Sequence, residues 1–252
     1  MTIDLTNKTA LITGASRGIG EATGRHLAEL GANVVLLARS SHDIKRIAEE
    51  IGGSALAVTG DVAAFDDVEK AVIAAIEQFG SLDILVNNAG LIDPIARLED
   101  SDPDGWSTVV DVNLKGVYNG LRMAVPLMRE QGGGVIVNLS SGAATAALEG
   151  WSHYCATKAA VLSLTKCVHK ESAKHGVRVV GLSPGTVATG MQTAIKDSGV
   201  NPVSQLDWDA HISPEWVARA IAWLTTDAAK EHDGGDFSLK TEKGGREVGL
   251  IG

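Results

Sequence analysis

The chain of 252 residues lacks the features that mark membrane, collagenous or disordered proteins. It has no run of about eighteen apolar residues, the length that a membrane-spanning helix requires. Its apolar share is 44% and its charged share 21%, the proportions of an ordinary globular protein. We therefore expect no membrane association and one sizeable hydrophobic core.

An excess of positive charge is also missing. The 22 Lys and Arg residues against 31 Asp and Glu residues give a net charge of −9, which disfavours binding to a phosphate backbone and makes nucleic acid an unlikely partner. Asp4 and Lys8 break up the amino-terminal segment, so it lacks the basic stretch and apolar block of a signal peptide, and we expect a cytoplasmic location. Cys155 and Cys167 are too few for a disulfide framework.

Short apolar segments alternate with amphipathic ones along the whole chain, which is typical of parallel strands joined by crossover helices. The apolar segments are rich in Val, Ile and Leu, as strands buried on both faces must be. Six such strands are predicted, at 9–12, 33–37, 55–58, 82–86, 135–139 and 177–182.

Helix signals lie between these strands. Gly31 predicts the end of a first helix, and Gly80 the end of another. The second of these helices is expected to start at Asp66, with Glu69 three residues later as in a capping box. Ser213 followed by Pro214 predicts the start of a late helix.

The whole of 1–252 is interpreted as one doubly wound α/β domain, since no repeat or linker divides it. At roughly 150 residues per domain the length alone would allow about 1.7 domains. The segment 183–213 is the exception to the alternating pattern, because it has weak periodicity over about thirty residues. Such a long loop is usually a lid or a binding segment, and we interpret it as the substrate cover.

A glycine-rich turn follows the first strand directly and leads into the first helix. Glycines allow the chain to approach a pyrophosphate, which the free N–H groups of the helix start can then hold. The glycine spacing differs from the common dinucleotide fingerprint, but the strand–turn–helix context is retained. Without a ligand the segment would be an ordinary turn. The candidate cofactor residues here are Gly14, Ser16, Arg17, Gly18, Ile19 and Gly20.

The end of the second strand bears on the type of dinucleotide. An acidic residue there usually holds the ribose 2′-hydroxyl of NAD, but this chain has Ala38 followed by Arg39. Arg39 and Arg17 could both reach a 2′-phosphate, so NADP(H) is predicted in preference to NAD(H). Arg39 could equally be a solvated charge at the end of a strand.

Tyr154 and Lys158 are spaced i and i+4, which puts them on one face of a predicted helix. A phenol is a poor base at neutral pH, and we expect the ammonium of Lys158 to lower the pKa of Tyr154. Such a phenol could act as a general acid or base on a carbonyl or alcohol oxygen, with the hydroxyl of Ser141 as a second partner. A Tyr/Lys pair alone is a weak signal, but here it accompanies a strand-end serine and a phosphate turn.

Taken together, these motifs resemble those of the short-chain dehydrogenase/reductase family, simple single-domain type, over nearly the whole chain. The resemblance implies a Rossmann-type parallel sheet of about seven strands with helices on both faces. It also implies a catalytic set, in which Asn113 maintains a water between the lysine and solvent. By position, that set is Asn113, Ser141, Tyr154 and Lys158.

The resemblance implies further cofactor contacts. Asp61 and Val62 are similar to the family's adenine-contacting pair, although Asp61 could be an ordinary strand-end cap. Tyr154 and Lys158 belong to the cofactor site as well, and relatives that use NAD have Asp where Ala38 stands. The remaining contacts expected by resemblance are Asn88, Ala89 and Gly90 after the fourth strand and Pro184, Gly185, Val187 and Thr189 after the sixth.

The function implied is hydride transfer between a nicotinamide and a carbonyl or secondary alcohol, as in a ketone reductase or a 3-oxoacyl reductase. No metal is expected. The alternatives are an NAD-dependent alcohol dehydrogenase of the same family, a non-catalytic dinucleotide-binding regulatory protein, and a methyltransferase, which would need neither Tyr154 nor Lys158. The polar tail 240–252 replaces the Asp-Gly-Gly ending of many relatives, so the resemblance does not carry a substrate identity.

The helices around Asn113 and Tyr154 carry apolar residues on more than one face, which predicts further burial. Relatives form homotetramers on these two helices. We therefore expect a homotetramer, with a homodimer as the second choice.

Overall fold

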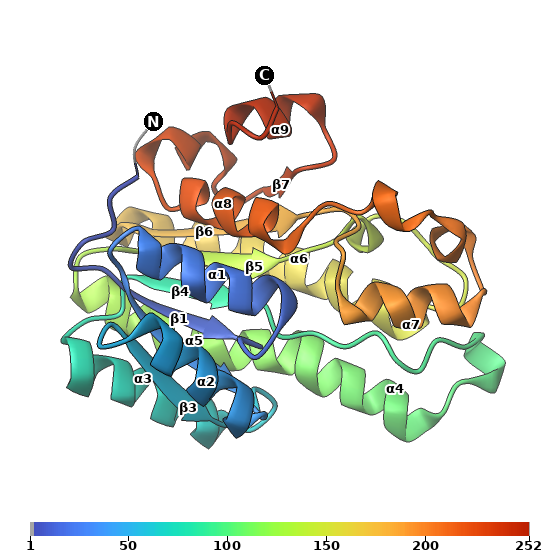
Figure 1. Cartoon of the computed structure of the whole chain (residues 1–252), viewed down its shortest axis with the longest axis horizontal. Coiled ribbons are helices and arrows are strands. Elements are labelled where there is room, and N and C mark those ends of the chain that lie inside the picture. Colours follow the sequence, from blue (N-terminus) through green and yellow to red (C-terminus); the bar gives the residue numbers. More distant parts are fainter. Residues whose placement is uncertain (1–2, 252) are drawn as a thin grey trace.

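The computed structural model describes residues 3–251. Its centre is a parallel sheet in the order β3-β2-β1-β4-β5-β6-β7 (Figure 1). The chain order reverses between β1 and β4, and in sheets of this type ligands bind beyond the carboxyl ends of the strands at such a reversal. The strands are β1 (Thr9–Thr13), β2 (Asn33–Ala38), β3 (Ala55–Thr59), β4 (Ile84–Asn87), β5 (Gly134–Leu139), β6 (Val177–Ser183) and β7 (Asp236–Ser238).

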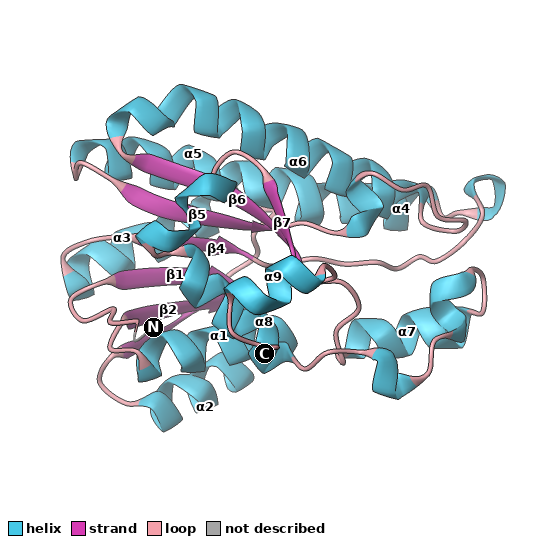
Figure 2. Ribbon diagram, turned by 90° about the horizontal axis from the view of Figure 1, so that it is seen from above, coloured by secondary structure: helices cyan, strands magenta, loops and turns pink. Residues whose placement is uncertain are grey.

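Helices cover both faces of this sheet (Figure 2). Helices α1, α2 and α8 lie on one face, and α3, α5 and α6 lie on the other. The helices are α1 (Gly18–Glu29), α2 (Ser41–Ile51), α3 (Phe65–Phe79), α4 (Pro103–Val110), α5 (Gly116–Glu130), α6 (Ser152–Ser172), α7 (Gly190–Ser198), α8 (Pro214–Leu224) and α9 (Glu242–Glu247). The predicted doubly wound architecture of about seven strands is confirmed.

Burial of both faces explains the uninterrupted apolar strands. In β2, Val34 and Leu36 pack with the α1 side, whereas Val35 and Leu37 pack with the α3 side. All four side chains are fully buried. Alternate residues of a strand point to opposite faces, so a strand between two helical layers must be apolar at every position.

Two predictions of local structure were wrong. Helix α3 begins at Phe65 after Ala64, so Asp66 lies inside the first turn and does not cap the helix. A carboxylate in the first turn still stabilises the helix through the dipole. The segment 183–213 is also not a continuous loop, since it contains α7 and two short 3₁₀ helices. Gln192 and Ile195 of α7 are buried, which supplies the packing that the weak periodicity did not indicate.

The late part of the chain completes the sheet and adds a tail. Strand β7 pairs with β6 in parallel, with Phe237 opposite Leu182. The polar residues that follow form the short helix α9, whose first turn is capped by the hydroxyl of Thr241 on the N–H of Gly244. Among residues 3–251, no helix is both long and apolar enough to cross a membrane.

Candidate active site

The glycine-rich turn joins β1 to α1 at the centre of the carboxyl edge of the sheet. Gly14 has φ of 65°, and a Cβ there would lie 2.8 Å from the Cα of Ala89. A Cβ on Gly20 would collide with the carbonyl oxygen of Gly14 and lie 2.7 Å from Nδ2 of Asn88. The turn is thus closed against its neighbours by the absence of side chains, and α1 begins within it at Gly18, so the first N–H groups of the helix, which have no partner inside the helix, lie at the turn.

Residues after β4 brace this turn from the side. Nδ2 of Asn88 donates to the carbonyl oxygens of Thr13 at 2.8 Å and Gly14 at 3.2 Å. The hydroxyl oxygen of Thr13 accepts from the backbone N–H groups of Asn88 at 3.0 Å and Ala89 at 3.1 Å. The structure therefore brings together two segments that lie more than seventy residues apart in the sequence, and both belong to the expected cofactor set.

Gly20→Ala is expected to weaken dinucleotide binding at least tenfold, about 1.4 kcal/mol. The added methyl would push the Gly14 carbonyl and Asn88 apart and so distort the phosphate turn. The measurement is the Kd for the cofactor by fluorescence titration. Gly53→Ala is the matched control, because a Cβ there meets nothing within 4 Å. An unchanged Kd in Gly20→Ala would show that the turn does not hold the cofactor.

The end of β2 carries the predicted selectivity corner. Ala38 ends the strand, and Arg39 follows with 64% of its side chain exposed. Nη1 of Arg39 lies 4.0 Å from Oδ2 of Asp61, which comes after β3. The other oxygen of Asp61 accepts from the N–H of Ala63 at 3.0 Å, so the strand-end capping that the sequence allowed does occur. Arg39 remains free to bend toward an anion, because the pair is long and solvated.

Val62 lies deeper than Asp61. Its side chain is buried beneath α5, and a Cβ on Gly116 would lie 2.8 Å from its Cγ2. Nδ2 of Asn119 donates to the carbonyl oxygen of Val62 at 2.8 Å. These contacts fix the backbone of the expected adenine-side segment against the helix layer.

The catalytic candidates lie where β5 ends and α6 begins. Ser141 follows β5, and its hydroxyl oxygen accepts from the N–H of Ala143. Tyr154 is in the first turn of α6, 8% exposed, with the Trp151 ring edge-on at 5.6 Å. Nζ of Lys158 lies 5.5 Å from the centre of the Tyr154 ring and donates to the carbonyl oxygen of Leu139 at 2.6 Å. The Tyr154 ring and the Lys158 ammonium thus lie near the end of β5, from which Ser141 follows.

The electrostatics of this group differ from the prediction. Burial raises the pKa of Tyr154 to about 12, although a hydrogen bond with Ser141 acts in the opposite direction. Burial also lowers the pKa of Lys158 to about 8, while the carboxylate of Asp236 opposes that shift. The expectation of a lowered phenol pKa was wrong for this structure, since desolvation of the buried phenol outweighs the hydrogen bond with Ser141. A phenol that is protonated at neutral pH is suited to donate a proton to a carbonyl oxygen.

Lys158→Met is expected to raise the free energy of unfolding by about 2 kcal/mol at pH 7. A Lys pKa lowered from 10.5 to about 8 means that keeping the buried ammonium charged costs about 3 kcal/mol of stability, which the variant regains. The variant also loses the hydrogen bond to Leu139, which lowers its free energy of unfolding by about 1 kcal/mol. Between pH 8 and 10.5 the unfolded state binds the extra proton, so wild-type stability should rise with pH there and the variant's should not.

Denaturant unfolding at pH 7 and pH 10 measures this difference. Lys170→Met is the control, because Lys170 is an exposed residue of the same helix. A variant less stable than the wild type at pH 7 would contradict the expectation that the buried ammonium costs stability.

Asn113 lies in a π-helical turn, Asp111–Lys115, between α4 and α5. Its side chain is fully buried, with Oδ1 accepting from the N–H of Leu91 at 2.7 Å and Nδ2 donating to the carbonyl oxygen of Leu91 at 2.8 Å. Nδ2 also lies 3.4 Å from the hydroxyl of Thr157 on α6. Asn113 therefore ties the segment after Gly90 to α6, and π-turns of this kind are frequent at functional sites.

The segment after β6 lies close to the glycine turn. Val187 is buried and forms a bridge with Ile212, which holds the two ends of the cover segment together. A Cβ on Gly18 would lie 3.2 Å from Cγ2 of Thr189, so this segment packs on the glycine turn. Pro184 and Gly185 lead out of β6, and the side chain of Lys240 lies over Gly185.

Asp236 was missed by sequence reasoning. Ser140 donates its hydroxyl to Oδ2 of Asp236 at 3.2 Å, and a Cβ on Gly181 would lie 2.8 Å from the other carboxylate oxygen. Desolvation raises the pKa of Asp236 to about 6, opposed by Ser140, Lys158 and Lys166. No spacing signal could have revealed it, because Asp236 approaches Ser140 only through the pairing of β7 with β6 and of β6 with β5.

Comparison with known proteins identifies the family to which the chain belongs. The family model described as short chain dehydrogenase matches residues 8–199. The chain belongs to the short-chain dehydrogenase family. The enzyme is accordingly an NAD(P)-dependent oxidoreductase that acts on CH–OH or ketone groups. The arrangement of β1, glycine turn and α1 fits a nicotinamide dinucleotide, because such a turn before a helix lets the backbone approach a pyrophosphate.

Relatives of this dehydrogenase carry related names. It is 37% identical over 230 residues to 3-oxoacyl-[acyl-carrier-protein] reductase FabG of Staphylococcus aureus (strain Mu50), covering 88% of this chain and 92% of that protein. It is 39% identical over 230 residues to 3-oxoacyl-[acyl-carrier-protein] reductase of Synechocystis sp., covering 89% and 92%.

A solved structure agrees with this assignment. The crystal structure of 3-ketoacyl-(acyl-carrier-protein) reductase from Brucella melitensis complexed with NADH matches with a TM-score of 0.84 and 35% identity. The match covers 94% of this chain and 98% of that one.

Proposed function

We propose that this dehydrogenase is an NADP(H)-dependent reductase of ketones that include 3-oxoacyl thioesters. The observation that carries the cofactor preference is the end of β2, where Ala38 and the exposed Arg39 leave no carboxylate on that strand to meet a 2′-phosphate. A guanidinium offers paired donors to a phosphate. The substrate class is supported by the names of the 3-oxoacyl reductases that this chain resembles.

The proposed roles of the residues follow from the site geometry. Bound nicotinamide supplies the hydride for the carbonyl carbon. Tyr154, held protonated by burial, donates its proton to the carbonyl oxygen. Ser141 orients that oxygen, and Lys158 holds the nicotinamide ribose with its ammonium. Asn113 fixes the backbone of Leu91 against α6 and so maintains the path by which Tyr154 recovers its proton.

The cofactor site is proposed to comprise the phosphate turn, the corner at Arg39, and the segments after β3, β4 and β6. Asp61 and Val62 are assigned to the adenine, Asn88 to Gly90 to the support of the turn, and the segment from Pro184 to Thr189 to the nicotinamide side. The cover 183–213, with α7, would close over the substrate as part of the single domain 1–252.

The test is a steady-state assay of NADPH oxidation at the nicotinamide absorbance. The panel contains a 3-oxoacyl thioester, a simple ketone and an aldehyde, each with NADPH and with NADH. We expect turnover with the thioester and with NADPH preferred. Absence of turnover with every carbonyl, together with tight cofactor binding, would instead identify a non-catalytic dinucleotide-binding protein.

An NAD-dependent alcohol dehydrogenase is the second candidate. It is favoured by the similar Brucella melitensis reductase, whose crystal structure is a complex with NADH. Oxidation of secondary alcohols with NAD, faster than any reduction with NADPH, would establish it.

We also propose a homotetramer, with a homodimer as second choice. A shallow apolar groove lies between α5 and α6, and Tyr118 in it is 51% exposed. Burial of such a groove against a second copy would remove apolar surface from water. Light scattering at micromolar concentration tests this, and a monomer would contradict it.

A further inference from the structure

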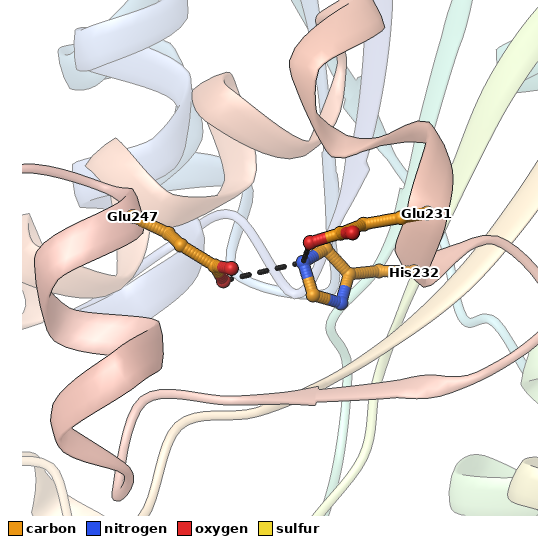
Figure 3. Close-up of side chains that lie close together, drawn as sticks. All are labelled: Glu231, His232 and Glu247. Atoms are coloured by element: carbon orange, nitrogen blue, oxygen red, sulfur yellow. Dashed lines mark ion pairs between the residues drawn. The ribbon is translucent and has the colours of Figure 1, made fainter.

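Three side chains able to bind a metal meet outside the active site, where the 3₁₀ helix Asp227–His232 faces α9 (Figure 3). They are Glu231, His232 and Glu247, and one ligand atom from each lies within 4.8 Å of the others. Figure 3 shows both carboxylates turned toward the same ring nitrogen of His232. The cluster therefore joins two separate elements of the carboxyl-terminal part of the chain.

Two of these ligand atoms are shielded from solvent and have no hydrogen-bond partner among the described residues. They are Nε2 of His232 and Oε2 of Glu247, which face each other at 3.2 Å. The two atoms form an ion pair when the imidazole is protonated. When the imidazole is neutral with its proton on Nδ1, they are two facing lone pairs, which a shared cation would satisfy at once.

The imidazole is held in place by aromatic neighbours. The ring of Phe237 in β7 meets it edge-on with centroids 4.7 Å apart, and the ring of Trp223 in α8 lies with its centroid 5.6 Å away. Phe237 and Trp223 are both buried. This packing fixes the direction of Nε2, as a metal ligand requires before the ion arrives.

The spacing of the ligand atoms suits zinc. Nε2 of His232 lies 3.2 Å from Oε2 of Glu247 and 3.5 Å from Oε1 of Glu231. Two atoms bound to zinc at about 2.0–2.1 Å in a tetrahedron are roughly 3.3 Å apart. Imidazole nitrogen and carboxylate oxygen are both common zinc ligands, and three protein ligands leave one position for water.

The ammonium of Lys243 would compete with a metal ion for the carboxylates of Glu231 and Glu247. Its ammonium lies 3.3 Å from Oε1 of Glu247 and 3.6 Å from Oε1 of Glu231, with 71% of the side chain exposed. It reduces the repulsion between the carboxylates when no ion is bound. An exposed lysine contributes little and can swing into solvent.

We propose that Glu231, His232 and Glu247 form a structural site for a divalent transition metal, zinc above all, which clamps α9 to the 3₁₀ helix before β7. Lys240, between the two halves of the site in sequence, packs on Gly185 of the nicotinamide-side segment. The clamp would hold this contact as well. The proposal is independent of the substrate and cofactor assigned above.

The first test is metal titration of the whole enzyme after dialysis against a chelator. Zinc at about a hundred times its Kd should raise the Tm by about 5–10 °C. Cobalt should give the visible absorption of a four-coordinate ion with nitrogen and oxygen ligands, and zinc should abolish it. A thiolate charge-transfer band in the near ultraviolet would reveal binding at Cys155 or Cys167 instead and would overturn the proposal.

Variants separate the site from adventitious binding. Glu247→Gln keeps the size of the side chain and should lower zinc affinity at least tenfold. Glu242→Gln, on the same helix and 72% exposed, should bind zinc as the wild type does. Lys243→Met should raise the affinity several-fold, because the competing ammonium is gone.

A simple ion-pair network predicts the opposite pattern. In that case zinc would leave the Tm of the wild type unchanged, or would shift it equally in Glu247→Gln. Lys243→Met would then only destabilise the fold. Either result rejects the metal site, and the cobalt spectrum of the wild type decides even if Glu247→Gln does not fold.

Discussion

Tyr154→Phe is expected to lower kcat by about 10²- to 10⁴-fold while leaving KM and the cofactor Kd nearly unchanged. The change removes only the phenol oxygen, and the ring would keep its edge-on contact with Trp151. In the wild type, burial holds this phenol protonated up to a pKa of about 12, so the proton is available at neutral pH. Transfer to the carbonyl oxygen occurs only in the transition state, which is why the loss should fall on kcat.

Steady-state kinetics of ketone reduction with NADPH measure this effect. Tyr118→Phe is the control, since Tyr118 is the other tyrosine of the chain and lies exposed on α5. It should retain the wild-type kcat. Turnover of Tyr154→Phe within a factor of about three of the wild type would mean that another group provides the proton, and the proposed role of Tyr154 would be abandoned.

Ala38→Asp is expected to shift the ratio of kcat/KM for NADPH to that for NADH by about 100-fold toward NADH, equivalent to about 3 kcal/mol. A carboxylate at the end of β2 would repel the 2′-phosphate and would accept a hydrogen bond from the ribose hydroxyl of NADH. It would also attract Arg39 and so withdraw the guanidinium that we assign to the phosphate.

Ala38→Asn isolates the contribution of charge, because it has the same shape as the aspartate and the same cost of fitting a 7%-exposed position. We expect it to move the ratio much less than Ala38→Asp does. Equal shifts in the two variants would attribute the preference to shape. A wild type that already prefers NADH would refute the NADP(H) assignment before any substitution is made.

The strands were predictable because their signal is local. Val34 to Leu37 are apolar at every position, and only burial on two faces accounts for that pattern. The glycine turn was predictable for a similar reason, since glycine at Gly14 and Gly20 reports a close approach of backbone to backbone. In both cases the cause lies within the segment that carries the signal.

Features that depend on partners distant in the sequence were not predictable. Helix α3 starts at Phe65, one residue before the Asp66 of the capping pattern. The carboxylate of Asp67 in its first turn accepts from the backbone N–H of Asp61, a contact with the segment after β3 that the capping pattern does not include. The pKa of Tyr154 follows from its degree of burial, which the i, i+4 spacing to Lys158 does not report. Asp236 approaches Ser140 only through the order of strands at the edge of the sheet.

Every strand of the sheet points the same way, so the carboxyl ends of all strands lie at one edge and the amino ends at the opposite edge. The segments assigned to chemistry leave the carboxyl ends of strands, whereas Gly52 and Gly53 enter β3 at its amino end, exposed and with open space around them. A fluorescent reporter or an affinity peptide grafted between these two glycines would sit across the thickness of the molecule from the reacting atoms. Labelled enzyme made in this way should turn over at the native rate.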